Sequence, residues 1–196
     1  GSEKLLEIDD DLIWNPVDII KLRNKKYSIN FVKYFYEFLM INKFADFEKS
    51  NFFLEIGGGY GGFTEILKKT CPGIKIIYID IAPQLYVAEQ YLKSIFPNKV
   101  LGFRETKKMD FITQDSFLNY DVLILPPWDI KKIKNNLIDN FYNAASFQEM
   151  QKDTVKNYCI ELGKIVKNNI ILYEQREGNG AIVDPVTRSD YINYMQ

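Results

Sequence analysis

The stretch Asn51-Phe-Phe-Leu-Glu-Ile-Gly-Gly-Gly-Tyr-Gly-Gly-Phe-Thr-Glu-Ile-Leu67 decides the fold. Its apolar run 52–56 predicts a buried strand, the glycine cluster that follows predicts a tight turn, and the residues from Phe63 onward predict a helix. Glycine permits positive φ angles and a close approach of a ligand, and the free N–H groups at a helix start attract negative charge. The stretch therefore predicts a turn that binds an adenosyl cofactor carrying a carboxylate or a phosphate.

Two known glycine motifs match the stretch 51–67. Gly57, Gly59 and Gly62 make the G-x-G-x-x-G of dinucleotide-binding folds. Glu55 with Gly57, Gly59 and Gly61 makes the E-x-G-x-G-x-G that opens S-adenosylmethionine (SAM) methyltransferases. The glycines alone do not decide between the two. Glu55 favours SAM, because a carboxylate stands where a dinucleotide strand normally has an apolar residue, and it can bind the ammonium of a methionine moiety.

Length and composition predict one domain. The chain has 196 residues, of which 46% are hydrophobic. We expect a helical appendage over residues 1–50 and an α/β domain over 51–196. The formal net charge of −1 gives no electrostatic reason to expect a nucleic-acid partner. No apolar run approaches the length that spans a membrane, so no membrane partner is expected either.

Histidine and cysteine usage narrows the chemistry. The chain has no histidine, which removes the commonest general base and most transition-metal sites. No carboxylate cluster has a recognisable ligand spacing, so we predict no metal site. Cys71 and Cys159 are the only cysteines and lie far apart, which is typical of a reducing compartment. With no signal peptide recognised, the cytoplasm is the expected location.

The region before the glycine turn is predicted to be helical. Asn15-Pro16 is a plausible start for a helix over residues 17–23, which has apolar residues at 17, 19, 20 and 22. A stronger helix is predicted from Ser28 to Asn42, with Ser28 or Asn30 as its N-cap.

The strand after the turn carries the next candidate site residue. The segment 74–80 predicts a second strand that ends at Asp80. Asp80 follows the turn by about twenty residues, the distance at which a carboxylate meets an adenosine ribose in parallel α/β folds. It can accept hydrogen bonds from both ribose hydroxyls, and Ile81 would then lie beside the adenine face. A helix is expected to begin near Pro83.

Further strands complete an alternating pattern. An irregular insertion is expected over 100–113, and a buried strand over 120–128 that Pro126-Pro127 ends. Trp128 is assigned either to the core or to an aromatic wall for the adenine. Segment 137–146 predicts another strand, followed by a long helix to about Val166 and a fifth parallel strand over 168–174. This alternation predicts a doubly wound, mostly parallel sheet that binds ligands at the carboxyl ends of its strands.

Two motifs together carry a family resemblance. The segments Glu55-Ile-Gly-Gly-Gly-Tyr-Gly-Gly62 and Asn143-Ala-Ala-Ser-Phe-Gln-Glu-Met150 resemble the sugar O-methyltransferases of bacteria, a class I SAM-dependent group with a Rossmann-like fold. The resemblance spans roughly residues 51–174. It implies SAM as the cofactor and a small-molecule or glycan acceptor.

The resemblance also implies roles for single residues. Glu55, the glycines of the turn with Gly58 among them, and Asp80 would bind SAM, while Asn143, Ser146 and Glu149 would line the methyl-transfer site. About twenty residues follow the fifth strand, so the C-terminal edge is expected to be abbreviated, and segment 181–183 is its one strand candidate.

Glu149 admits two roles. A sugar hydroxyl must lose its proton to attack a methyl group, and without histidine Glu149 is the best-placed general base. Alternatively, Ser146 and Glu149 match the S-x-x-E capping box of a helix N-terminus. Two other functions stay open for the whole chain. A NAD-linked oxidoreductase shares the glycines and Asp80, and a non-catalytic SAM-binding subunit is possible if the acceptor cleft is incomplete.

Overall fold

The computed structural model describes residues 2–173 and 185–195. The elements, in chain order, are α1 (Ser2–Leu5), β1 (Ile19–Leu22), β2 (Lys25–Ser28), α2 (Ile29–Ala45), η1 (Phe47–Lys49), β3 (Phe52–Ile56), α3 (Gly62–Thr70), β4 (Lys75–Ile79), α4 (Ala82–Ile95), β5 (Val100–Leu101), α5 (Phe103–Thr106), η2 (Gln114–Phe117), β6 (Val122–Leu125), η3 (Pro127–Lys132), β7 (Ile138–Ala144), η4 (Phe147–Glu149), α6 (Lys152–Ile165), β8 (Val166–Tyr173) and α7 (Arg188–Tyr194).

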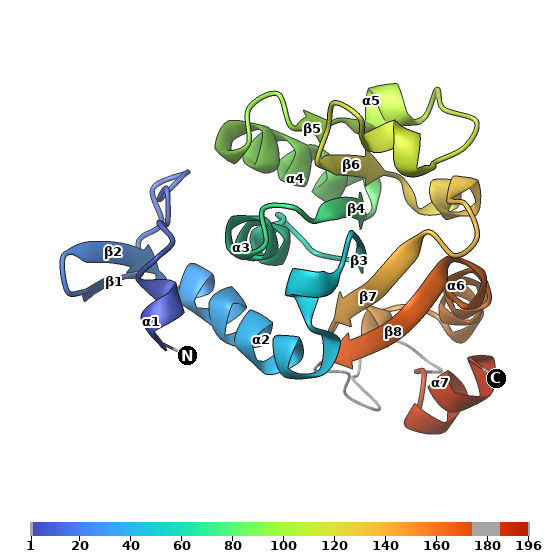
Figure 1. Ribbon diagram of the computed structural model, residues 1–196. Helices are drawn as coiled ribbons and strands as arrows, with labels where there is room; N and C mark the ends of the chain where they lie inside the picture. The colour runs from blue at the N-terminus through green and yellow to red at the C-terminus, as the bar shows by residue number, and fades with distance from the viewer. Residues whose placement is uncertain (1, 174–184, 196) are drawn as a thin grey trace.

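A central sheet of parallel strands organises the molecule. Its order is β5-β6-β4-β3-β7-β8, and every neighbouring pair is parallel. From β3 the chain goes to β4, then to the edge strand β5 and back to β6, before it crosses to β7 on the other side of β3 (Figure 1). The order therefore reverses between β3 and β7, which confirms the predicted doubly wound sheet and puts its switch point there.

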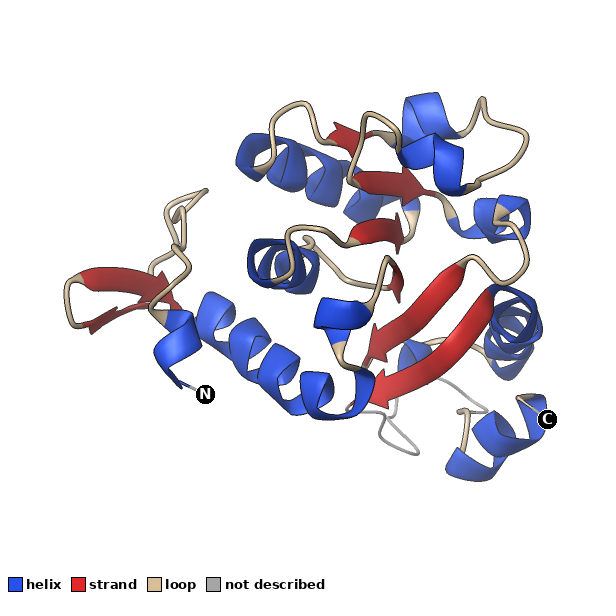
Figure 2. Ribbon diagram, viewed as in Figure 1, coloured by secondary structure: helices blue, strands red, loops and turns tan. Residues whose placement is uncertain are grey.

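Helices cover both faces of the sheet (Figure 2). Because side chains alternate along a strand, Phe53 faces a core formed with α2, α3 and α4, whereas Leu54 faces a core formed with α6 and α7. The residues of α2 thus share a hydrophobic core with the sheet. Cys71 lies in the first core and Cys159 in the second, both as free thiols.

The helix predicted over residues 17–23 is wrong. Residues 19–22 form β1, which pairs antiparallel with β2 through a two-residue turn in which Arg23 has a φ of 54°. Isoleucines favour an extended backbone, and a turn of this length closes a hairpin. The hydroxyl of Tyr27 in β2 donates to the carbonyl of Leu5 at 3.0 Å, which ties the hairpin to the N-terminal segment.

The next helix agrees with its prediction, and Ser28 is its cap. The Ser28 side chain accepts a hydrogen bond from the N–H of Phe31 at 3.2 Å, so the first turn of α2 is satisfied. Asp10 in turn accepts from the Ser28 hydroxyl at 2.8 Å. The residues before the hairpin therefore help to fix the start of α2.

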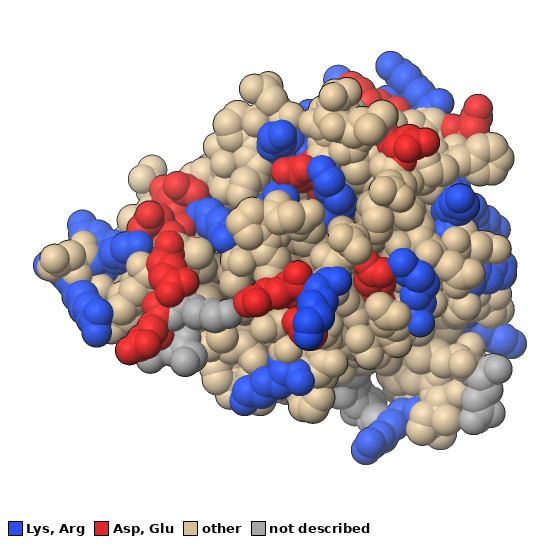
Figure 3. Space-filling view, viewed as in Figure 1, with Lys and Arg blue, Asp and Glu red and all other residues tan. Residues whose placement is uncertain are grey.

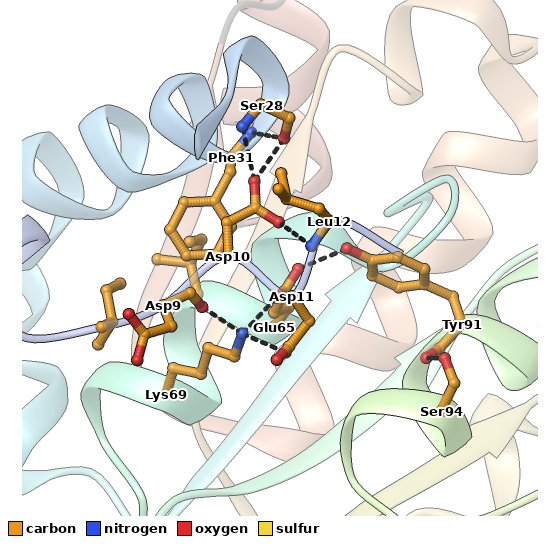
Figure 4. A network of polar contacts seen from close by, with 12 residues as sticks. Asp9, Asp10, Asp11, Leu12, Ser28, Phe31, Glu65, Lys69, Tyr91 and Ser94 are labelled. Carbon is orange, nitrogen blue, oxygen red and sulfur yellow. Dashed lines mark hydrogen bonds and ion pairs between the residues drawn. The ribbon is translucent and has the colours of Figure 1, made fainter. Parts of the chain in front are cut away.

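A polar network fastens this N-terminal region to α3 (Figure 4). The ammonium of Lys69 lies 2.7 Å from Asp11 and 2.7 Å from Glu65, and it also donates to the carbonyl of Asp9. The Tyr91 hydroxyl of α4 donates to the other oxygen of Glu65 at 2.6 Å. Burial raises the pKa of Glu65, and Lys69 opposes that shift. The network thus links three separate segments around one buried carboxylate.

Segment 100–113, predicted as an irregular insertion, contains more regular structure than expected. Val100 and Leu101 form the short edge strand β5, and Ile112 forms a single bridge with Ile133.

Helix α7 was not predicted, although Thr187 and Asp190 form a capping box at its start. The strand candidate over 181–183 lies outside the described residues.

Charged side chains of both signs are interspersed on the face shown in Figure 3, with Lys and Arg prominent at the hairpin end. The hairpin contributes Lys21, Arg23, Lys25 and Lys26. No helix within the described residues combines the length and the hydrophobicity that a membrane span requires.

Candidate functional site

The register of the sheet brings three strand ends to one level. Ile56 of β3 pairs with Ile79 of β4, and Ile79 pairs with Leu125 of β6. The N–H of Gly57 continues the ladder by donating to the carbonyl of Ile79 at 2.8 Å. The glycine turn therefore lies at the same edge of the sheet as the end of β4 and the start of η3. This edge is next to the switch point between β3 and β7.

The turn depends on glycine geometry. Gly57, Gly59 and Gly61 have φ angles of 74°, 64° and 94°, in the left-handed region that other residues avoid. A Cβ on Gly57 would overlap the Ser146 side chain, whereas a Cβ on Gly59 would have no heavy atom within 4 Å. Gly57 is thus packed against the end of β7, while Gly59 faces open space where a ligand can approach the backbone.

Asp80 holds the turn in place. Its Oδ2 accepts from the N–H of Gly59 and from the Tyr78 hydroxyl, both at 3.0 Å, and its Oδ1 accepts from the N–H of Ile81 at 2.7 Å. Burial raises the pKa of Asp80, and these hydrogen bonds oppose the shift. A carboxylate has about four lone-pair positions, so Asp80 retains room for one further donor. That is less than the two ribose hydroxyls expected from the sequence.

Glu55 lies directly beneath the turn. It is 3% exposed, and its Oε2 accepts a hydrogen bond of 2.5 Å from the Thr64 hydroxyl of α3. A Cβ on Gly58 would lie 2.5 Å from its Oε1, so only glycine fits above it. Burial raises the pKa of Glu55 to about 8, against the hydrogen bond from Thr64, with the negative charge of Asp80 adding to the rise. Glu55 is therefore mainly protonated, and so uncharged, at physiological pH.

A small cavity opens beside Glu55. We call it the turn pocket; it has a volume of about 150 Å³ and is lined by Lys33, Tyr34, Glu37, Glu55, Gly57, Gly58, Gly59, Phe63, Tyr142, Ala144 and Ala145. Glu37 is 2% exposed and accepts from the Tyr142 hydroxyl at 3.1 Å. Burial and the charges of Glu55 and Glu37 raise the pKa of Tyr34. The pocket therefore joins two buried carboxyl groups to one cation, Lys33, which lies 3.6 Å from Glu37.

Sequence reasoning missed the contribution of α2 to this pocket. Lys33, Tyr34 and Glu37 lie on one face of the helix, as their spacing of three and four residues requires. The available signal was Glu37 itself, a carboxylate between Phe35 and Phe38 in an otherwise apolar stripe. A charged residue on a core-facing stripe is rarely left without a polar partner.

Asn143 and Ser146 join the end of β7 to the turn. Asn143 is fully buried, and its amide donates to the carbonyl of Ile56 at 2.8 Å and to the Ser146 hydroxyl at 2.5 Å. Its Oδ1 accepts from the N–H of Phe147 at 3.2 Å. With its side chain committed in this way, Asn143 positions the turn from below.

The capping box predicted for Ser146 and Glu149 is wrong. Ser146 makes no side-chain cap to η4, because its hydroxyl is held by Asn143 instead. The first regular turn here is only the short η4, and α6 begins later, at Lys152. The Glu149 side chain is exposed, and only its backbone N–H contacts Ser146, by donating to the carbonyl at 3.1 Å. The Glu149 carboxylate is therefore accessible from outside the fold.

A second cavity lies between α6 and η3, the turn that follows β6. We call it the η3–α6 groove; it has a volume of about 440 Å³ and is lined by Pro127, Trp128, Ile130, Lys131, Thr154, Asn157, Tyr158, Ile160 and Glu161. Burial raises the pKa of Tyr158 to about 12, and the charge of Asp80 contributes, so this floor residue lies near the end of β4. Trp128 is 69% exposed and Ile81 57% exposed, so neither belongs to the core.

Known proteins share this fold. The sequence itself matches no family model and no curated protein. A Nostoc punctiforme protein assigned as an O-methyltransferase has a TM-score of 0.54 at 12% identity, over 84% of this chain and 48% of that one. PigF bound to S-adenosylhomocysteine (SAH) has a TM-score of 0.52 at 12% identity, over 79% of this chain and 46% of that one.

The chain spans about half the length of these two proteins. At such low identity the likeness shows the fold alone. It confirms the predicted Rossmann-like architecture of class I methyltransferases.

Substitutions at two glycines test the geometry of the turn. Alanine at Gly59 should cost about 1 kcal/mol of unfolding free energy, for the left-handed backbone alone. Alanine at Gly57 should cost about 2–4 kcal/mol, because overlap with Ser146 adds to the strain. Adding Ser146→Gly to Gly57→Ala should recover part of that loss. Urea-induced unfolding measures all three variants, and equal losses for Gly57→Ala and Gly59→Ala would contradict the packing described.

Proposed function

We propose that the chain is a SAM-dependent methyltransferase. The observation that carries this proposal is the glycine turn at the switch point of the sheet, held by Asp80, with the turn pocket beside it and the η3–α6 groove at the strand end two places along the sheet. Ligands of open α/β sheets bind at such a point, outside the carboxyl ends of the strands. The two cavities suit the two halves of an adenosyl–methionine ligand, one charged and small, the other larger and mostly apolar.

The methionine half fits the turn pocket. Its ammonium would meet Glu55 and Glu37, and its carboxylate would meet Lys33 or the backbone N–H groups of the turn. Glu55 and Glu37 are both buried, and Lys33 is the one lysine that lines the pocket, so the pocket gains an excess of negative charge once Glu55 ionises. A cationic ligand removes the cost of holding these groups close together.

The adenosine half fits the end of β4 and the groove beyond it. Asp80 has room to accept from one ribose hydroxyl while it keeps its bonds to the turn. Ile81 and Trp128 expose apolar surface on either side of this edge, as the faces of an adenine ring require. Between the two halves, Gly59 leaves space for the ligand to approach the backbone closely.

The finer proposal is O-methylation of a sugar hydroxyl. When bound, SAM supplies an electrophilic methyl group that the hydroxyl oxygen takes as the carbon–sulfur bond breaks, which gives a methyl ether and SAH. Glu149 takes the hydroxyl proton, since it follows the Asn143–Ser146 segment and its side chain is exposed. Asn143 and Ser146 position that segment against the turn, so that oxygen, carbon and sulfur can be aligned.

Calorimetry with SAM, SAH and NAD tests the ligand class. We expect SAM and SAH to bind and NAD to bind more weakly or not at all, because Glu55 and Glu37 create a site for an ammonium that NAD lacks. Tighter binding of NAD than of SAM would favour the oxidoreductase. SAM binding with no methyl transfer to any sugar acceptor would favour the non-catalytic subunit.

The raised pKa of Glu55 predicts a proton release. At pH 7 this carboxyl is mainly protonated, since its pKa is about 8. A bound ammonium favours the ionised form, so SAM binding at pH 7 should release about one proton and tighten as the pH rises toward 8. Calorimetry in two buffers of different ionisation enthalpy gives the proton count. The release should vanish in Glu55→Gln, and an unchanged release in that variant would disprove the assignment.

In the absence of ligand, the raised pKa of Glu55 predicts the opposite pH dependence for the stability of the fold. Its pKa in the fold, about 8, exceeds the ordinary value of 4.5. The folded chain therefore binds more protons than the unfolded chain between these values, and this contribution to stability is lost as the pH rises through 8. Glu55→Gln serves as the control for both measurements.

Glu149→Gln tests the general base. The side chain is exposed and caps no helix, so the substitution should leave the melting temperature and SAM affinity unchanged. Turnover of a sugar acceptor should fall by roughly two to four orders of magnitude, because glutamine cannot take the proton. Glu105→Gln, an exposed side chain of α5 that lines neither cavity, is the matched control. A near-normal rate in Glu149→Gln would exclude it as the base.

We further propose that the reaction takes place in the cytoplasm, on a small-molecule or glycan acceptor. We also propose that it needs no metal. In the described part of the chain, no three His, Cys, Asp or Glu side chains gather as a metal site would require. A turnover that EDTA abolishes and magnesium restores would contradict this proposal.

A further inference from the structure

The two walls of the η3–α6 groove differ in chemistry. On the η3 side, Pro126 and Pro127 have no backbone N–H, and the N–H of Asp129 is taken by the carbonyl of Pro126 at 3.0 Å. Trp128 presents a largely exposed ring on the same side. This wall therefore offers a surface for stacking and few hydrogen-bond donors.

The α6 wall carries the polar groups. Thr154, Asn157 and Glu161 are three and four residues apart, so they line one face of the helix above Tyr158. Glu161 already binds Lys164 at 2.9 Å. The Asn157 side chain is exposed to the groove and makes no hydrogen bond with the rest of the described chain. Its carboxamide offers both donors and an acceptor in one plane.

We propose that Asn157 reads the polar edge of the cofactor's adenine while the ring lies against Trp128. This inference rests on the proposed function. A carboxamide pairs in two places with adenine, accepting from the 6-amino group and donating to the neighbouring ring nitrogen. Tyr158, which lines the groove next to Asn157, stacks on Phe147 with ring centroids 5.6 Å apart and is fixed in this way. The base is thus recognised by a side chain of α6, because the prolines of η3 leave that wall poor in N–H groups.

The test couples a change in the protein to a change in the ligand. Calorimetry would compare SAH with its analogue that carries hydrogen in place of the 6-amino group. The wild-type chain should prefer SAH by roughly three- to tenfold, the effect of one hydrogen bond. Asn157→Ala should weaken SAH binding and bring the preference close to one. Asn193→Ala, an exposed asparagine of α7 that lines neither cavity, should keep the full preference.

A third variant separates stacking from edge recognition. Trp128→Ala should weaken both ligands alike, by roughly five- to hundredfold, and leave the preference unchanged. A preference for the 6-amino group that persists in Asn157→Ala would overturn the inference even though SAH binds. Absence of SAH binding to the wild-type chain would instead overturn the proposed function, and this inference with it.

Discussion

The parallel register between β3 and β4 is the constraint on which the site depends. It pairs Ile56 with Ile79, and the bond from Gly57 to Ile79 extends the ladder one residue past the strand. A slip by one residue would turn Glu55 and Tyr78 to the opposite face and place Asp80 out of reach of Gly59. Because one face packs on α2 to α4 and the other on α6, both faces oppose such a slip. The core thereby fixes the positions of the polar groups that form the turn and its pocket.

Burial of the carboxyl groups gives the site its character. Glu37, Glu55 and Asp80 are each less than one-tenth exposed and converge on the turn. A chain selected for stability alone would place apolar residues at such positions, since a buried charge without a full counter-charge is costly. The fold tolerates them through neutral donors: Thr64 for Glu55, Tyr142 for Glu37 and Tyr78 for Asp80. Hydrogen bonds from neutral groups add no counter-charge. Glu37 also has Lys33 at 3.6 Å, whereas Glu55 and Asp80 form no ion pair in the described part of the chain, so they stay available to a cationic ligand.

The sequence predicted the fold well because glycine spacing and strand composition act locally. The glycine turn, the apolar strands and the Ser28 cap are each properties of a few adjacent residues. The hairpin at 19–28 was missed because two isoleucines and a leucine fit a short helix as well as a strand, and the outcome was decided by pairing with β2.

Contacts between distant segments were the hardest part of the site to predict. Glu55 and Asp80 were found from their spacing to the turn, but Glu37 enters from a helix whose docking angle no local pattern encodes. The capping box at Ser146 failed for a related reason. Its hydroxyl had a competing partner in Asn143, which a motif of four residues does not reveal.

The segment between β7 and η4 combines strain with tight fixation. Ala145 has a φ of 60°, unusual for a residue with a Cβ, and the N–H of Ser146 donates back to the carbonyl of Ala144 at 2.7 Å. Such a conformation persists only where its surroundings enforce it. Here Asn143 holds the segment from below, and the N–H of Ala145 donates to the carbonyl of Tyr173 on β8 at 3.0 Å. Ala144 and Ala145 also line the turn pocket, so the strained backbone forms part of its wall. The same bonds that shape the pocket consequently also set the position of Glu149. Fewer than ten residues of chain separate this proposed base from the wall of the pocket proposed to hold the methyl donor.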